Sequence, residues 1–227
     1  MKEFLTSACN RVLKIYSRSA IDRFITSEIS KIPRDSLVLS VGAGGTFGRS
    51  LRNISEANGW TLLEIDIDKN RQPDLVGDIC DVKLDQKFHA IVALEVFEHV
   101  KSPGEAFENC LFHLRDGGKI FGSTPFLFPI HDEPHDFFRF TEYGLRYLMR
   151  EYDKICVRPR SGFFVMFGTV AARLWRSDSR GLRVISLPLM LFLYILWPFA
   201  VFLDRMLVSR FAPSGYLFTA EKKNDQG

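Results

Sequence analysis

Short apolar runs and segments of helical periodicity alternate along the chain. The apolar runs predict strands at residues 37–41, 60–67, 73–79, 88–94, 119–124 and 154–158. The run FHAIVAL at 88–94 is almost continuously apolar, which is typical of a central strand buried on both faces of a parallel sheet. Strands that alternate with helices at this spacing predict a doubly wound α/β sheet.

The stretch from Leu37 to Gly48, LVLSVGAGGTFG, joins the first predicted strand to a glycine-rich turn. An amphipathic helix is predicted to follow over residues 49–57. Glycine lets the backbone adopt positive φ and approach a ligand closely, and ligands of open α/β sheets bind at such turns. Because such a turn also joins a strand to a helix for packing alone, this stretch by itself leaves both roles open.

Acidic residues end the second predicted strand, WTLLEIDI at residues 60–67. Asp66 follows Gly42 by 24 residues, and an acid at this place in such folds hydrogen-bonds the hydroxyls of a ribose. We therefore expect Asp66 to contact a nucleoside ligand. A solvated acidic loop is the alternative.

Composition limits the class of protein. The 227 residues, 46% hydrophobic and 25% charged, suffice for one domain or one domain with an insertion. A formal net charge of +3 is too mild to indicate a nucleic-acid partner. The four cysteines are scattered without a C-x-x-C pair, which favours a reducing compartment. Charged residues near the N-terminus argue against a signal peptide, so we expect the cytoplasm.

Two further segments are expected to lie outside the central domain, which takes up residues 37–158 and 214–223. Residues 1–36 are predicted to form amphipathic helices that pack on the domain or close over its site. Residues 159–213 are predicted to form a hydrophobic helical insertion.

The motifs along the central domain together resemble the class I S-adenosylmethionine-dependent methyltransferases. The resemblance runs from about Leu37 to Glu151 and includes the glycine turn, EIDID, GDI, ALEVFEHV and LRDGGKIFGSTP. It implies a seven-stranded, Rossmann-like sheet that is mostly parallel, with the segment Ser214–Lys222 as an antiparallel last strand. A nicotinamide-dependent dehydrogenase, which uses a similar turn, explains neither this last strand nor EVFEHV.

The resemblance also implies where S-adenosylmethionine binds. Gly42, Ala43 and Gly44 are expected under its methionine part, with Leu94 and Glu95 beside it. The ribose is expected at Asp66 and the adenine at Ile67, Asp78 and Ile79. Three positions depart from the family pattern, namely Ser40, Thr46 and His89.

A cluster of polar residues follows the fifth predicted strand, at the sheet edge where substrate is expected. The segment HDEPHDFFRFT begins at His131 and includes His135, and imidazoles serve as acid–base groups near neutral pH. We predict catalytic roles for His131, His135 and His99. The alternative is a loop made rigid by hydrogen bonds, with Arg139 paired to Asp136 or Asp132.

The spacing E-x-x-E-H at Glu95, Glu98 and His99 resembles the metal site of small-RNA 2′-O-methyltransferases and some quinone-pathway O-methyltransferases. The resemblance implies that His131 or His135 completes such a site. Carboxylates and imidazoles suit Mg²⁺, Mn²⁺ or a similar ion. In metal-free relatives the same residues cap a helix or face the pocket, so we assign no metal from the sequence.

Residues 184–203, VISLPLMLFLYILWPFAVFL, carry no charge and are about long enough to cross a bilayer. A single crossing conflicts with a last strand that returns to the same sheet, and two prolines favour a bent helix. We therefore expect a bent helical pair on the membrane surface, with a buried lid or a dimer contact as the alternative.

Taken together, the sequence predicts a methyltransferase that acts on a hydroxyl or amine of a small acceptor, which is lipid-linked or a saccharide. A non-catalytic, membrane-associated protein that has kept the fold is the alternative function.

Overall fold

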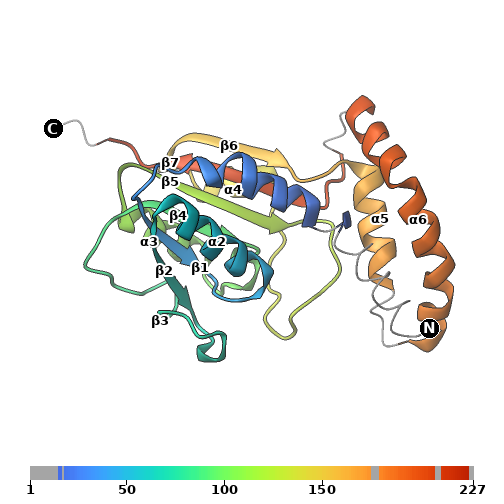
Figure 1. Cartoon of the computed structure of the whole chain (residues 1–227), viewed down its shortest axis with the longest axis horizontal. Helices are drawn as coiled ribbons and strands as arrows, with labels where there is room; N and C mark the ends of the chain where they lie inside the picture. Colours follow the sequence, from blue (N-terminus) through green and yellow to red (C-terminus); the bar gives the residue numbers. More distant parts are fainter. Residues whose placement is uncertain (1–14, 17, 175–178, 208–210, 225–227) are drawn as a thin grey trace.

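Seven strands form one sheet in the order β3-β2-β1-β4-β5-β7-β6 in the computed structural model, which describes residues 15, 16, 18–174, 179–207 and 211–224 (Figure 1). The strands are β1 Leu37–Val41, β2 Thr61–Asp66, β3 Leu75–Val76, β4 Phe88–Leu94, β5 Leu114–Pro125, β6 Asp153–Pro159 and β7 Gly215–Glu221. The strand β7 is antiparallel to both β5 and β6, and the other pairings are parallel. This topology confirms the predicted fold class.

Local differences from the predicted strands have physical reasons. The strand β5 begins five residues before the predicted strand at 119–124 and includes a stretch where the pairing with β4 shifts register and Gly117 has a φ of +70°. The strand β3 is shorter than predicted, since the Asp78 side chain accepts a hydrogen bond from the Cys80 amide and turns the chain.

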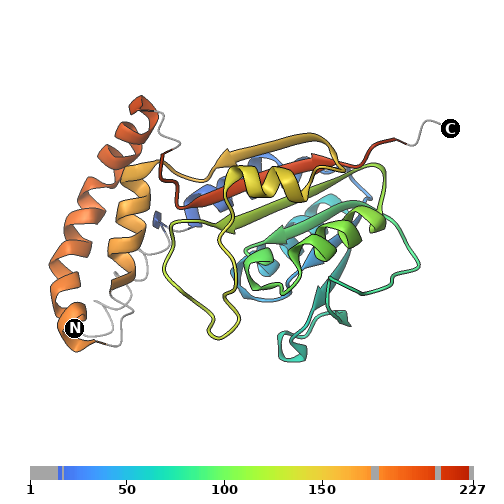
Figure 2. The same cartoon turned by 180° about the vertical axis from the view of Figure 1, so that it is seen from behind.

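Helices cover both faces of the sheet. The labelled helices are α2 Gly45–Asn58, α3 Pro103–His113, α4 Glu142–Leu148, α5 Phe163–Arg173 and α6 Arg180–Leu207, of which α2, α3 and α4 lie on the faces. Short 3-10 turns are η1 Ile29–Lys31, η2 Lys69–Arg71 and η3 Phe97–His99. A helix over residues 18–27 and α2 cover one face, burying Phe24 and Leu51 against β1 and β4 (Figure 1). The helices α3 and α4 cover the other face, where Phe107 and Leu145 enter the larger core (Figure 2).

The helices α5 and α6 form an antiparallel pair beyond the carboxyl ends of β5 and β6 (Figures 1 and 2). The predicted bent pair within residues 184–203 is wrong, because α6 runs unbroken through Pro188 and Pro198 and its partner is α5. An interior proline removes a backbone donor and clashes with the preceding turn, at a cost of about 3 kcal/mol or more, and α6 continues past both prolines despite this cost. No helix in the described part of the chain is both long enough and apolar enough to cross a membrane.

Candidate functional site

A cavity of about 430 Å³ opens at the carboxyl edge of the sheet, above β1 and β4. Its floor is the glycine turn and the end of β4, its side is the loop after β5, and its cover comes from the helix over residues 18–27 and from α5. The lining residues are Arg18, Ile21, Gly42–Phe47, Arg71, Leu94, Glu95, Val96, His99, Phe128, His131, Asp132 and Arg173. Five of the predicted cofactor residues, Gly42, Ala43, Gly44, Leu94 and Glu95, therefore share one cavity.

The glycine turn has a backbone that other residues cannot adopt easily. Gly42 has a φ of +88°, and a Cβ built there would lie 2.7 Å from Cγ2 of Val96. The Gly42 amide donates to the Ile65 carbonyl at 2.8 Å, which ties the turn to the neighbouring strand β2. Both constraints hold the backbone of the turn away from the cavity and so leave room for a ligand.

Asp66 fixes the turn from the end of β2. Its Oδ2 accepts from the Ala43 amide at 2.8 Å and its Oδ1 from the Asp68 amide at 2.9 Å. Arg71 lies 3.4 Å from the same carboxylate. The structure thus gives Asp66 a role in shaping the turn, while its contact with a ribose stays a prediction.

The residues predicted to meet the adenine lie outside the lining of this cavity. Ile67 is 72% exposed, Ile79 is buried, and Asp78 is bonded to the turn that follows β3. Their contacts with a ligand remain predictions.

The structure brings two of the three predicted catalytic histidines together. The rings of His99 and His131 lie 4.9 Å apart between centroids, edge to face, and both line the cavity. The His135 side chain is exposed and does not line it. The His135 carbonyl instead accepts from Nδ1 of His99 at 2.8 Å, which orients that ring and leaves its Nε2 free to accept a proton.

A carboxylate–arginine pair holds the loop that carries His131. Arg139 binds both oxygens of Asp136, at 2.5 and 2.6 Å, and this pairing lowers the pKa of Asp136 to about 2. The same carboxylate accepts from the His131 amide at 3.0 Å and lies 3.3 Å from Nδ1 of its ring. One of the two predicted Arg139 pairings is therefore present, and it serves to place His131.

Glu98 is fully buried below the two imidazoles. Its Oε1 lies 3.7 Å from Nε2 of His99 and 3.8 Å from Nε2 of His131, and neither carboxyl oxygen has a hydrogen-bond partner among the described residues. Burial raises the pKa of Glu98 to about 7. Burial alone would lower the pKa of His131, but the carboxylates of Glu98 and Asp136 raise it above the ordinary value. Glu98 and His131 therefore perturb each other's pKa across this gap.

The same three residues could also hold a metal ion. One ligand atom each from Glu98, His99 and His131 lie within 4.8 Å of one another. The other ring nitrogens face the His135 carbonyl and the Asp136 carboxylate, as is usual for metal-binding histidines.

Glu95 takes a different role from the one that its spacing to Glu98 suggests. Its carboxylate pairs with Arg160 at 2.7 Å and accepts from Oγ of Ser123 at 2.8 Å, so it does not join the cluster of Glu98, His99 and His131. It lines the cavity above β1 and β4, with its carboxylate turned toward β5 and β6.

The three departures from the family pattern have distinct surroundings. Ser40 is buried in β1, and its hydroxyl has no hydrogen-bond partner among the described residues. Thr46 lies in the first turn of α2 and lines the cavity. Nδ1 of His89 accepts from the Leu37 amide at 3.0 Å, which explains the imidazole at the start of β4 by its contact with the chain before β1.

Sequence reasoning did not place Arg18, Arg71, Phe128 or Arg173 at this cavity. The guanidinium of Arg173 lies over the Phe128 ring, 4.4 Å from its centroid, so α5 is joined to the loop after β5. The amphipathic pattern of residues 2–32 was a signal for Arg18 and Ile21, because it predicts a helix that closes over the site. No spacing rule connects residues 128 and 173.

A family model described as a methyltransferase domain matches residues 14–167 of the chain. This match takes in β1 to β6, the glycine turn and both cavity histidines. A comparison with curated protein sequences found no match.

Solved structures of similar fold include a phosphoethanolamine N-methyltransferase 2 from Haemonchus contortus in complex with S-adenosyl-L-methionine, with a TM-score of 0.59 and 11% identity. The alignment covers 92% of this chain and 53% of that one, so the chain spans about half the length of the nematode protein. An S-adenosylmethionine-dependent methyltransferase from Archaeoglobus fulgidus gives a TM-score of 0.58 and 13% identity, covering 91% of this chain and 95% of that one. The cyclase SpnF gives 0.57 and 15%, covering 89% and 80%, so the fold also serves another reaction.

Proposed function

The chain belongs to the methyltransferase-domain family, as a class I S-adenosylmethionine-dependent methyltransferase, and we propose that it methylates a hydroxyl or amine of a small acceptor. One observation carries the proposal about the acceptor. His99 and His131 line the same cavity as the glycine turn, so a base and the proposed cofactor bed face one space. A lipid-linked compound or a saccharide is the class of acceptor that we favour.

The proposed cofactor bed uses the residues predicted from the sequence. The methionine part would lie over Gly42, Ala43 and Gly44, beside Leu94 and Glu95. The ribose would bind Asp66, and the adenine would lie near Ile67, Asp78 and Ile79. When bound, S-adenosylmethionine supplies an electrophilic methyl group on a sulfonium. The buried turn and its ties to Ile65 and Asp66 position it, and positioning alone can contribute several kcal/mol to such a displacement.

His131 is the proposed general base. Asp136 faces its Nδ1, which favours a proton on that nitrogen and leaves Nε2 to accept the proton of the acceptor hydroxyl or ammonium. Glu98 lies 3.8 Å from Nε2 and would share this proton after the transfer. His99 is held toward the same space by the His135 carbonyl.

A cofactor-binding test examines the core of this proposal. S-adenosylhomocysteine should raise the melting temperature of the protein, because a ligand at 100 times its Kd adds about 2.7 kcal/mol of stability. NAD is the negative control. Conversion of S-adenosylmethionine to S-adenosylhomocysteine should then be followed with candidate hydroxyl and amine acceptors. Stabilisation without turnover for any acceptor would favour the non-catalytic alternative.

A divalent cation at Glu98, His99 and His131 is a second proposal for the same cluster. The unpartnered, buried carboxylate between two oriented imidazoles supports it. Isothermal titration with Mg²⁺ and Mn²⁺ should give heat with the wild type and none with Glu98→Ala. Glu105→Ala, at an exposed carboxylate of α3, is the matched control. No heat with the wild type would leave the acid–base role alone.

We also propose that α6 contacts a membrane surface on the cytoplasmic side. The helix carries exposed apolar side chains, among them Ile195 at 74%, Phe199 at 55% and Phe202 at 54%. Flotation with liposomes should be lost in the variant Ile195→Lys/Phe199→Lys and retained in Tyr147→Lys, which alters an exposed residue of α4. If the wild type does not float but forms a dimer, and the double lysine variant is a monomer, this surface would be assigned to a second copy of the chain.

A further inference from the structure

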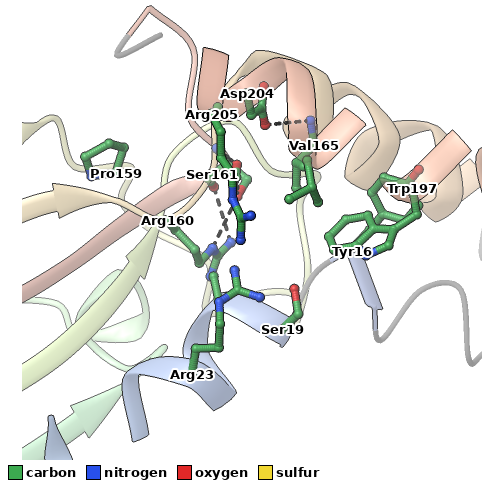
Figure 3. Close-up of a pocket in the computed structure, with 14 residues that line it drawn as sticks. Tyr16, Ser19, Arg23, Pro159, Arg160, Ser161, Val165, Trp197, Asp204 and Arg205 are labelled. Atoms are coloured by element: carbon green, nitrogen blue, oxygen red, sulfur yellow. Dashed lines mark hydrogen bonds between the residues drawn. The ribbon is translucent and has the colours of Figure 1, made fainter. Parts of the chain in front are cut away.

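A second cavity, of about 380 Å³, lies at the same edge of the sheet as the cofactor cavity but above β6 and β7 (Figure 3). It is enclosed by the helix over residues 18–27, by the start of α5 and by the last turns of α6. Neither the cofactor bed nor the proposed base belongs to its lining.

Three guanidinium groups from three separate elements line this cavity. Arg23 comes from the N-terminal helix, Arg160 from the end of β6 and Arg205 from α6, and Figure 3 shows them pointing toward one another. Arg160 is 5% exposed and is fixed by Glu95, by Oγ of Ser214 and by the Ser214 carbonyl. Within the described residues, neither Arg23 nor Arg205 has an ion-pair partner.

The one carboxylate in the lining is already engaged. Asp204 accepts from the amides of Phe164 and Val165, at 2.9 and 3.1 Å, and so caps the start of α5. Glu95 is engaged by Arg160. Among the described residues, no carboxylate pairs with the two remaining guanidiniums, Arg23 and Arg205, although they converge on one space.

Apart from Ser19, Ser161 and Ser214, the rest of the lining is apolar or aromatic. The rings of Tyr16 and Trp197 lie 4.5 Å apart, edge to face, and Val165 and Val201 extend this wall. A ligand with a charged end and an apolar body would therefore match both parts of the cavity.

From this arrangement we infer that the second cavity binds a phosphate group of the methyl acceptor. A phosphate monoester carries roughly two negative charges at neutral pH and offers several oxygens to guanidinium forks, whereas a carboxylate carries one charge. The ion pair of Glu95 with Arg160 joins the two cavities, since Glu95 lines the first and Arg160 the second. An acceptor held here by its phosphate would have to extend past this ion pair for its reactive group to reach the methyl donor. That the phosphate belongs to a methyl acceptor rests on the proposed methyltransferase function. That the cavity binds a phosphate does not.

The test uses the full chain and n-hexyl phosphate as the probe, followed by isothermal titration. We expect the wild type to bind hexyl phosphate, to bind hexanoate more weakly and not to bind hexanol. The variant Arg23→Gln/Arg205→Gln should lose at least tenfold in affinity for hexyl phosphate. Arg150→Gln, at an exposed arginine of the loop after α4, should keep the wild-type affinity. Equal affinity of the wild type and the double variant, equal affinity for hexanoate, or no binding of hexyl phosphate would each overturn the inference.

A second arm identifies the source of the phosphate. Flotation on phosphatidylcholine vesicles with phosphatidic acid, lost in the double arginine variant, would assign the phosphate to a lipid. Binding of hexyl phosphate without flotation would assign it to a soluble acceptor. S-adenosylhomocysteine should bind the wild type and both variants equally. Failure to bind it, with hexyl phosphate still bound, would count against the methyltransferase function and not against the phosphate site.

Discussion

The two cavities at the carboxyl edge of the sheet are built in opposite ways. The cofactor cavity has a floor made from strand ends, with Gly42 tied to β2 by its backbone and Asp66 holding the turn. The second cavity takes its cationic side chains from two helices, with Arg23 on the helix over residues 18–27 and Arg205 on α6. A floor of strand ends places backbone groups and leaves little freedom, whereas long cationic side chains on helices can adapt to different acceptors.

This difference suggests a division of labour. Under the proposed assignments, the rigid bed would hold the cofactor and the wall of side chains the acceptor. The ion pair of Glu95 with Arg160 connects the two, because Glu95 lines the first cavity and Arg160 the second.

Breaking that ion pair should have the largest effect. Arg160→Met leaves the Glu95 carboxylate without its partner, and removal of one member of a buried pair costs about 3 to 5 kcal/mol. Urea denaturation should record this fall in the free energy of unfolding. Arg158→Met, two residues earlier in β6, is the matched control, because its exposed pairing with Glu28 is worth about 1 kcal/mol or less. Equal losses in the two variants would contradict the joining role of Arg160.

Gly42→Ala should weaken ligand binding in the first cavity and leave binding in the second cavity unchanged. The new Cβ would lie 2.7 Å from Val96 and would require a φ of +88°, so the turn must rise into the cofactor bed. Affinity for S-adenosylhomocysteine should fall about a hundredfold, equal to about 2.7 kcal/mol. Binding of hexyl phosphate should stay within a factor of three. Gly104→Ala, where a Cβ has open space, should change neither. Parallel loss of both ligands would mean that the cavities do not act separately.

Glu98→Gln should change how stability depends on pH. The carboxyl has a pKa of about 7 in the folded protein and an ordinary value of 4.5, so the folded protein holds the proton more tightly than the unfolded chain. The free energy of unfolding of the wild type should therefore fall between about pH 5 and pH 8, by about 2 to 3 kcal/mol from this group. His131 adds to the fall, because its folded pKa is also raised.

Glutamine cannot ionise, so the variant should be more stable than the wild type at pH 8 and similar to it at pH 5. Denaturation in the presence of a chelator measures this difference without a bound metal. An equal slope in both proteins would exclude Glu98 as the titrating group.

The smallest expected effect concerns the orientation of His131. Asp136→Asn removes one of the carboxylates that raise the pKa of this imidazole, so we expect that pKa to fall. Titration of the ring protons by NMR gives the value. His89, which contacts Leu37 in another part of the molecule, should titrate as in the wild type. An unchanged His131 would show that its surroundings other than Asp136 set its pKa.

The sequence predicted the sheet well where burial alone decides the pattern. The strand β4 matches the predicted run Phe88–Leu94 at both ends, because a strand buried on both faces needs apolar residues throughout. The path of the segment 184–203 was predicted wrongly. Two prolines favour a break because each removes a backbone donor, yet this segment lies within the single helix α6, which packs along α5.

The site was predictable where it depends on a strand end. Gly42 and Asp66 follow from fixed distances along one strand–turn–helix–strand unit. The choice between His131 and His135 was not predictable, because it depends on how Asp136 and Arg139 fold the loop. Nor could spacing connect Glu95 with Arg160, which lie 65 residues apart.

The position of β7 has a consequence for the order in which the molecule can form. The strand β6 pairs only with β7 among the described strands, and β7 inserts between β6 and β5. During synthesis, β6 and the helices after it must therefore wait without a docking edge until residues 215–221 leave the ribosome. Ser214, which holds the Arg160 guanidinium, arrives at the same moment. The strand β7 thus completes the sheet and the second cavity together.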